Sequence, residues 1–272
     1  MRKWLSRPAS DTQITHGARL WLYVFGGLVM AFLMVPSLIV IPMSFSDSQH
    51  LQFPPRGWSL RWYENYLGSR QWMQATWVSV KVALLAMAVA TPLGTLAAYG
   101  LHGSRFRFLQ LVMLVLLTPI IVPVILIGIG VFYLYVRLGL LNTIPGIVIA
   151  HSLLSLPLVV LVVAAGLKGY DMNQELAARS LGASRARAFF TVTLPQIRFS
   201  VITAALLAFL TSFDEVIVAL FVSGGQNSTL TRSMFLALRD QIDPTIAAIS
   251  TLLIVFATAM LAVSLFLRKP GP

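Results

Sequence analysis

Five stretches of this 272-residue chain contain no Lys, Arg, Asp or Glu. They cover residues 20–46, 82–104, 108–136, 138–167 and 244–267. About 20 apolar residues of helix cross the hydrocarbon core of a bilayer, so each stretch is long enough to span one. Charged residues make up only 11% of the chain, whereas soluble domains contain roughly 25%. The sequence therefore predicts an all-α polytopic membrane protein.

Six transmembrane helices are expected, and they cover roughly residues 20–45, 75–101, 108–135, 145–167, 199–222 and 245–267. Each must be helical because lipid offers no hydrogen-bond partner to open backbone groups. The fifth is interrupted by Asp214 and Glu215, but apolar residues lie on both sides and the segment has the length of a span. Pro92, Pro119 and Pro123 are expected to kink the second and third spans.

The distribution of the 20 basic residues predicts the orientation. Roughly twice as many lie on one side of the six spans as on the other, and Lys81 lies at the edge of a span. Cytoplasmic loops carry the excess of positive charge, so both termini are expected in the cytoplasm. The expected parts are a cytoplasmic N-terminal segment, a six-helix transmembrane domain and a cytoplasmic tail, over residues 1–19, 20–267 and 268–272.

The predicted outer loop, residues 46–74, is rich in tryptophan and tyrosine. We interpret these residues as an interfacial belt, because their rings suit the apolar side of a membrane interface and their polar tips suit water. A docking surface for an external partner is the alternative.

The composition argues against several other classes of protein. The net charge of +11 would suggest a nucleic acid partner for a soluble protein, but in a membrane protein it follows from basic cytoplasmic loops. There is no cysteine, and the four histidines include no H-E-x-x-H pair, so no metal site is expected. No G-x-S-x-G elbow is present. We therefore expect no catalytic residue, no nucleic acid partner and no enzymatic activity.

Asp214 and Glu215 cost most to place in a membrane, because a carboxylate in the middle of a span costs roughly 2.5 kcal/mol or more. One interpretation is structural: Lys81 pairs with one of the acids, or else extends to the interface. The other is that at least one acid lines the translocation path and favours a cationic cargo. Phe213 and Tyr99 join the acids as candidates for the substrate path, since aromatic rings bind ammonium groups through cation–π contacts.

The predicted loop over residues 168–198 is longer than a connection requires. Apolar side chains alternate there with arginines, which predicts a short amphipathic helical unit. The apolar positions are Leu176, Leu181, Phe189 and Phe190. Gly182 divides the unit, and Pro195 is expected to end it before the next span. Because so short a helix is marginal in water, its apolar face requires a partner, either the membrane surface or another protein.

This loop resembles the EAA loop of ABC importer permeases, whose pattern is Glu-Ala-Ala, then Gly, then Leu-Pro. The matching residues are Ala177, Ala178, Gly182, Leu194 and Pro195. The Glu of the pattern falls on Leu176, while Glu175 lies one place earlier. A shift of one residue turns a side chain by about 100° around a helix. Glu175 is therefore not expected to inherit the family role.

Residues 60–66, 91–94 and 212–215 resemble permeases of the polyamine (spermidine/putrescine) branch. The resemblance implies the type I ABC importer permease (MetI-like) fold in the bacterial cytoplasmic (inner) membrane. It also implies an ATPase-coupling loop, formed by Leu176, Ala177, Ala178, Leu181, Gly182, Ala183, Leu194 and Pro195.

The resemblance further implies three partners: a second permease subunit, a dimer of ABC ATPases and an extracytoplasmic substrate-binding protein. The chain contains no G-x-x-x-x-G-K-[ST] phosphate loop, so ATP and Mg are expected in the ATPase and no cofactor in this chain. The implied cargo is a small organic cation, putrescine or spermidine. Alternatives are an amino acid-like solute, an opine, a phosphonate or ferric ion. A stand-alone secondary carrier is a further alternative, although it would have no use for the loop.

Overall fold

The fold is that of a computed structural model, which describes residues 15–104, 107–240 and 243–267. Within these ranges every regular element is a helix, and one isolated β-bridge pairs Ser46 with Trp58. The predicted all-α class is therefore confirmed for the described residues. The chain consists of two compact units, namely residues 1–65 with 243–254 and residues 66–242 with 255–272.

In the first unit, α2 (Leu20–Ser44) coincides with the first predicted span. None of its 18 most apolar consecutive residues is buried within the protein, as expected of a helix whose sides meet lipid. The aromatic segment that follows packs on its end, because the Tyr63 hydroxyl lies 2.7 Å from Ser44 Oγ. Tyr63 belongs to α3 (Arg61–Gly68), and Asn65 of the same helix donates a hydrogen bond to Thr245 Oγ1 at 2.8 Å.

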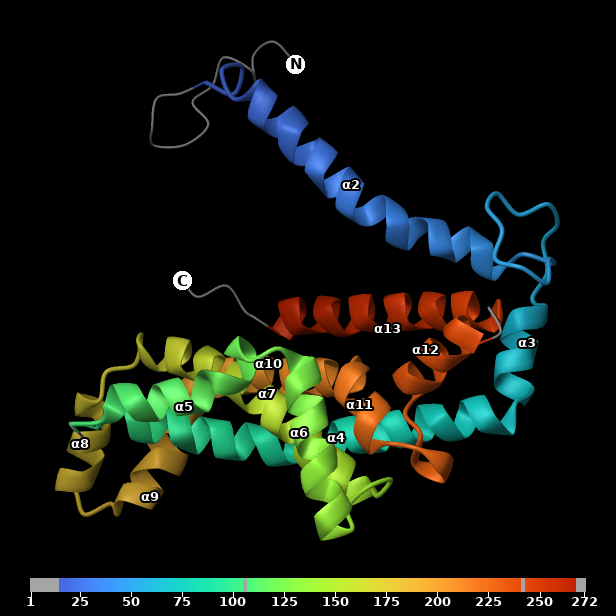
Figure 1. The fold of residues 1–272 in the computed structure, drawn as a ribbon. Coiled ribbons are helices and arrows are strands. Elements are labelled where there is room, and N and C mark those ends of the chain that lie inside the picture. Colours follow the sequence, from blue (N-terminus) through green and yellow to red (C-terminus); the bar gives the residue numbers. More distant parts are fainter. Residues whose placement is uncertain (1–14, 105–106, 241–242, 268–272) are drawn as a thin grey trace. The chain divides into compact units, whose positions relative to one another are not determined.

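The second unit is built around three long helices that lie side by side (Figure 1): α4 (Arg70–His102), α7 (Ile144–Leu167) and α10 (Leu194–Phe213). Small residues line their contacts. On α4 these include Ala83, Ala86 and Ala90, each 0% exposed. Small side chains let helix backbones approach closely, which favours packing between helices in lipid. A Cβ added at Gly94 would lie 2.6 Å from Val159 Cγ1.

The directions of these helices follow from their contacts. Ser152 of α7 donates a hydrogen bond to the carbonyl of Ala86 on α4, and Val159 of α7 faces Gly94 further along α4, so these helices are parallel. α10 is antiparallel to both, because His151 of α7 contacts Ser212 while Ser155, further along α7, donates to the carbonyl of Ala208. The last turns of α4 and α7 therefore lie beside the first turn of α10. We call this the loop end of the helix core, and the other the break end.

The third predicted span, residues 108–135, is not one straight helix. α5 (Leu109–Ile121) and α6 (Val124–Leu138) are bent by 99° at the residues between them. Pro123 lies in this break, where its missing N–H removes a helical hydrogen bond. Pro92 and Pro119 lie inside helices. The expected kink is thus confirmed at Pro123, and it is much larger than an ordinary proline kink.

The fifth predicted span, residues 199–222, is divided in the structure. α10 ends at Phe213 and α11 (Ile217–Val222) begins after three further residues. We call residues 214–216 the helix break. The prediction of one continuous helix is wrong here, because the Glu215 carboxylate accepts a hydrogen bond from the N–H of Val218 that competes with the helical ones. Beyond α11 follow η2 (Gly225–Asn227) and α12 (Leu230–Asp240).

Pro195 does not end the helical unit that precedes it. α9 (Arg185–Ala188), the π-helical turn η1 (Phe189–Thr193) and α10 continue one another, and Pro195 lies in the first turn of α10. In η1 the N–H of Leu194 donates to the carbonyl of Phe189, five residues back. The wider π turn accommodates a proline because the usual four-residue bond is already absent there.

Four described helices are long and apolar enough to cross a membrane, and the bent pair α5–α6 makes up to five. α13 (Thr245–Leu267) is apolar as well, but its apolar stretch Thr245–Met260 is shorter than a span. A count of six spans therefore stays a prediction. The predicted N-terminal segment is described only from residue 15, and the predicted tail, residues 268–272, lies outside the described residues.

Candidate functional site

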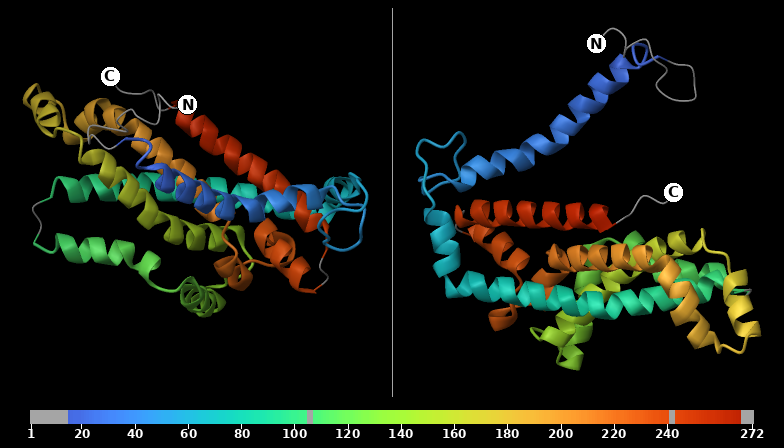
Figure 2. Two further views of the ribbon diagram at one scale, coloured as in Figure 1. Left: turned by 90° about the horizontal axis from the view of Figure 1, so that it is seen from above. Right: turned by 180° about the vertical axis from the view of Figure 1, so that it is seen from behind.

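The loop over residues 168–198 folds as two short helices joined by a turn. α8 (Asn173–Ser180) is followed by Gly182, whose φ of +93° is accessible to glycine at little cost. Ser184 then begins α9, because its hydroxyl accepts a hydrogen bond from the N–H of Arg187 at 3.3 Å. Figures 1 and 2 show both helices at the loop end of the helix core. The predicted division at Gly182 is confirmed.

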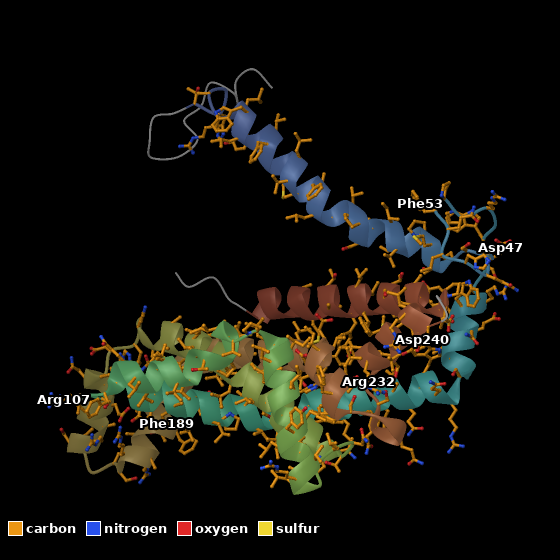
Figure 3. All side chains as sticks on the ribbon, in the orientation of Figure 1. Asp47, Phe53, Arg107, Phe189, Arg232 and Asp240 are labelled. Carbon is orange, nitrogen blue, oxygen red and sulfur yellow. The ribbon has the colours of Figure 1, made fainter. Side chains whose placement is uncertain are left out.

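Three of the four predicted apolar positions of this loop are exposed. The exposed fractions are 90% for Leu181, 62% for Phe190 and 51% for Leu176. Phe189 differs, since it is buried at the loop end of the core (Figure 3). Its ring centre lies 4.7 Å from that of Tyr99. The loop therefore presents an apolar surface, as its sequence predicts, but Phe189 belongs to the helix core instead.

The other predicted coupling residues lie around this surface. Ala177 and Pro195 are exposed, and Ala178, Ala183 and Leu194 are half-buried.

Glu175, which lies one place before the Glu of the family pattern, is the buried polar centre of the loop. Its side chain is 2% exposed. The Tyr99 hydroxyl donates a hydrogen bond to Glu175 Oε1 at 2.6 Å, and the Thr193 hydroxyl donates one to Oε2 at 2.8 Å. The Tyr170 hydroxyl lies 3.0 Å from Thr193 Oγ1, and the Arg185 guanidinium lies 5.5 Å from the centre of the Tyr99 ring. Tyr99 therefore anchors the loop.

At the break end, the two acids have different surroundings. Glu215 Oε1 accepts a hydrogen bond from the N–H of Val218 at 2.8 Å, and the Glu215 carbonyl accepts one from Thr231 Oγ1 at 3.0 Å. Glu215 thus holds the start of α11 and the start of α12. Asp214 is exposed, and its carboxylate has no hydrogen bond or ion pair with any residue that the structure describes. The open carboxylate of the helix break is that of Asp214.

Lys81 pairs with neither acid. In the described part of the chain a single ion pair is present, and it joins Arg239 to Asp240. Lys81 is exposed on α4, whereas α7 and α10 contact the opposite, alanine-lined surface of that helix. The predicted pairing therefore has no counterpart among these residues.

The two aromatic candidates lie at opposite ends of the core. Phe213 precedes the helix break, but it is buried and its ring stacks on Phe209 at a centroid distance of 5.7 Å. Phe256 of α13 completes the cluster, 6.1 Å from Phe213. Tyr99 lies at the loop end with Glu175. The structure thus does not bring Tyr99 together with Asp214, and a substrate contact of either ring stays a prediction.

His151 is a further buried polar residue of the core. Its Nδ1 lies 2.9 Å from Ser212 Oγ, next to the residues of the helix break. Its Nε2 is buried without a partner among the described residues. No group of His, Asp and Glu in these residues is arranged to hold a metal ion. A histidine inside an apolar span was the only sequence signal for this contact, since polar residues in spans usually face the bundle interior.

Comparison with known proteins identifies the family to which this architecture belongs. Residues 90–269 match the model of the family described as binding-protein-dependent transport system inner membrane component. The putrescine transport system permease protein PotI of Escherichia coli (strain K12) is 33% identical over 241 residues, which cover 86% of this chain and 85% of that protein. The spermidine/putrescine transport system permease protein PotC of Haemophilus influenzae is 29% identical and covers 89% and 94%.

A solved bacterial ABC transporter involved in the import of the acidic polysaccharide alginate has the same fold. Its TM-score is 0.68 at 16% identity, and the match covers 98% of this chain and all of the other. The helices, the loop and these matches define a permease, which is a transport subunit and not an enzyme. The chain belongs to the family of inner membrane components of binding-protein-dependent transport systems. The resemblance noted in the sequence is confirmed.

Proposed function

We propose that this chain is the permease subunit of an ATP-driven importer of putrescine or spermidine. The observation that carries the proposal is the open carboxylate of Asp214 in the helix break. A carboxylate inside an otherwise apolar segment is costly, so it is retained where it serves a function. Its negative charge favours a cargo that carries ammonium groups.

The helix break itself adds to this preference. α10 ends at Phe213, and the C-terminal end of a helix carries a partial negative charge. Transporters commonly bind cations where a membrane helix is discontinuous, using the carbonyl groups of the interrupted backbone. Asp214 directly follows such an end. The similarity to two permeases whose names include putrescine agrees with a cationic cargo.

The partners follow from the same proposal. The loop with its exposed leucines binds one subunit of an ABC ATPase dimer, which binds ATP and Mg. A second permease subunit completes the path, and an extracytoplasmic binding protein delivers the cargo. Both termini then face the cytoplasm, and the chain resides in the bacterial cytoplasmic membrane, in agreement with the family description.

An amino acid-like or phosphonate cargo is a second candidate, and Arg232 favours it. This residue follows Thr231, which contacts the helix break. Its Nη1 donates to Ser228 Oγ at 3.1 Å, while its buried Nε has no partner among the described residues. Burial lowers the pKa of the Arg232 guanidinium from its ordinary value. An anionic group on the cargo would stabilise this cation.

Uptake of labelled putrescine and spermidine tests the proposal, in cells with and without the chain and before and after ATP depletion. Asp214→Asn is expected to reduce uptake about tenfold or more, because a lost charged contact is worth roughly 1.5–3 kcal/mol. Asp240→Asn is the matched control, since Asp240 is an exposed acid of α12 that pairs with Arg239. Equal uptake by both variants would exclude Asp214 from the path. Competition by an amino acid or phosphonate, lost in Arg232→Met, would support the second candidate.

A further inference from the structure

The orientation of α8 is the reverse of what its sequence favours. Glu175 is 2% exposed, whereas the neighbouring Leu176 is 51% exposed. A short helix at the surface ordinarily exposes its acids and buries its leucines. The contacts that hold Glu175 must therefore contribute more free energy than the burial of a carboxylate and the exposure of a leucine together cost.

Hydrogen bonds account for this burial. A carboxylate is stable away from water only where hydrogen-bond donors replace the water. Each oxygen of Glu175 has one such donor, Tyr99 at 2.6 Å and Thr193 at 2.8 Å. Hydrogen bonds to an ionised acceptor are roughly twice as strong as bonds between neutral groups. The carboxylate is thus a strong connection as well as a buried one.

The connection joins separate parts of the fold. Tyr99 lies on α4, Tyr170 in the turn after α7, and Thr193 in η1 directly before α10. Arg185 of α9 lies against the ring of Tyr99. The Glu175 carboxylate, which is carried by α8, therefore joins α4 directly and α10 through η1. The turn after α7 is joined to it indirectly, through Tyr170 and Thr193.

We propose that Glu175 is a positioning residue that fastens α8 to the three core helices, so that a displacement of the loop moves these helices together. The inference rests on the proposed function, because it takes the loop to be the part of the chain that an ATPase moves. Besides this connection, Gln196 of α10 donates a hydrogen bond to Gln174 of α8, and both side chains are exposed. Without Glu175, only this exposed bond, the flanking turns and the contacts with η1 and α9 would hold α8. A force on its exposed surface would then displace α8 more than it displaces the core helices.

The route to the other end of the core is continuous. Thr193 directly precedes α10, which runs without a break for 20 residues to Phe213. At about 1.5 Å per residue, this helix spans about 30 Å. A displacement at Glu175 therefore reaches Asp214 along one helix, and α4 and α7 move with it through their close contacts.

The first experiment measures backbone hydrogen exchange of the full chain in lipid nanodiscs, and needs neither cargo nor ATPase. Glu175→Ala is expected to speed exchange in residues 173–181 about tenfold, since loss of hydrogen bonds to a charged group corresponds to at least that factor. Tyr99→Phe removes one of the two bonds and is expected to give a smaller increase. Tyr133→Phe is the control, because Tyr133 lies on α6 and is 68% exposed. Unchanged exchange in Glu175→Ala would overturn the proposal.

The second experiment measures ATP hydrolysis and cargo uptake by the whole complex, both in one preparation of lipid vesicles that contain it. Glu175→Ala keeps the exposed leucines, so it is expected to retain the ATPase and to hydrolyse ATP. Uptake per ATP is expected to fall roughly tenfold, in line with the loosened helix. Glu175→Gln keeps the shape and one acceptor oxygen, and is expected to give an intermediate ratio.

The outcomes separate the connection from the cargo. If the Glu175→Ala variant no longer binds the ATPase, Glu175 only maintains the fold of the docking surface, and the proposal is overturned. An unchanged amount of cargo taken up per ATP hydrolysed also overturns the proposal. If the wild-type complex hydrolyses ATP without taking up putrescine or spermidine, while Glu175→Ala speeds exchange in α8, the fastening of α8 is supported and the proposed cargo is refuted.

Discussion

Replacing Leu181 by serine tests whether the loop binds a protein. This side chain is 90% exposed. Burial of a whole leucine side chain contributes about 1.5–3 kcal/mol, and nine-tenths of this surface is open to a partner. At about 1.4 kcal/mol for each factor of ten, Leu181→Ser is expected to weaken binding of the ATPase by about 10- to 100-fold.

The assay is a titration of the full chain in nanodiscs with the purified ATPase subunit of its own transporter. Leu138→Ser is the control, because Leu138 is a leucine at the end of α6 that is also largely exposed, at 58%. The control is expected to bind with wild-type affinity. If the Leu181→Ser variant binds the ATPase as tightly as the wild type does, the Leu181 side chain is not buried in the interface with the ATPase. The membrane surface would then be the partner of this side chain.

Two further substitutions test the helix core and the helix break by thermal unfolding in detergent. Gly94→Val is expected to destabilise the chain by about 1–3 kcal/mol through overpacking against Val159, whereas Gly100→Val on the same helix, with open space around it, is expected to be milder. Glu215→Ala is expected to cost about 1 kcal/mol, because the N–H of Val218 loses its acceptor. Equal unfolding temperatures for the two glycine variants, or an unchanged one for Glu215→Ala, would contradict these assignments.

The sequence predicted the positions of the first and fourth apolar helices well, since each is a long run without charge. The first and fourth predicted spans, residues 20–45 and 145–167, agree with α2 and α7 to within a residue. Their bends were less predictable. Pro123 divides two helices and Pro92 lies inside one, although both are prolines in apolar surroundings. A proline is tolerated inside a membrane helix where neighbouring groups satisfy the freed backbone carbonyls, and the local sequence does not specify those neighbours.

The division of roles at the helix break was not visible in the sequence. Asp214 and Glu215 are adjacent acids, and their separate roles depend on where the chain turns. Glu215 reaches the N–H of Val218 only because α10 has already ended. Lys81 suggested an ion pair because it is a basic residue at the edge of a span, but a position along the sequence does not specify which neighbours that side of the helix meets.

In the coupling loop, too, the sequence predicted only part of the structure. Leu176, Leu181 and the division at Gly182 were predicted from the apolar pattern of the loop, and the structure exposes both of these leucines. The one-residue displacement of Glu175 from the family pattern was noted, but its consequence depends on Tyr99, which is 76 residues away in the sequence. Contacts of that kind follow from the packing of whole helices, which no local pattern contains.

The alanine-lined surface of α4 has a consequence for movement. Ala83, Ala86 and Ala90 have no side-chain torsion that could change, and they present a nearly smooth surface to the neighbouring helices. Interlocked leucines would lose rotamer freedom when two helices pack against each other. Alanines lose none, so α4 and α7 pack closely at no cost in side-chain entropy and can be displaced as one unit.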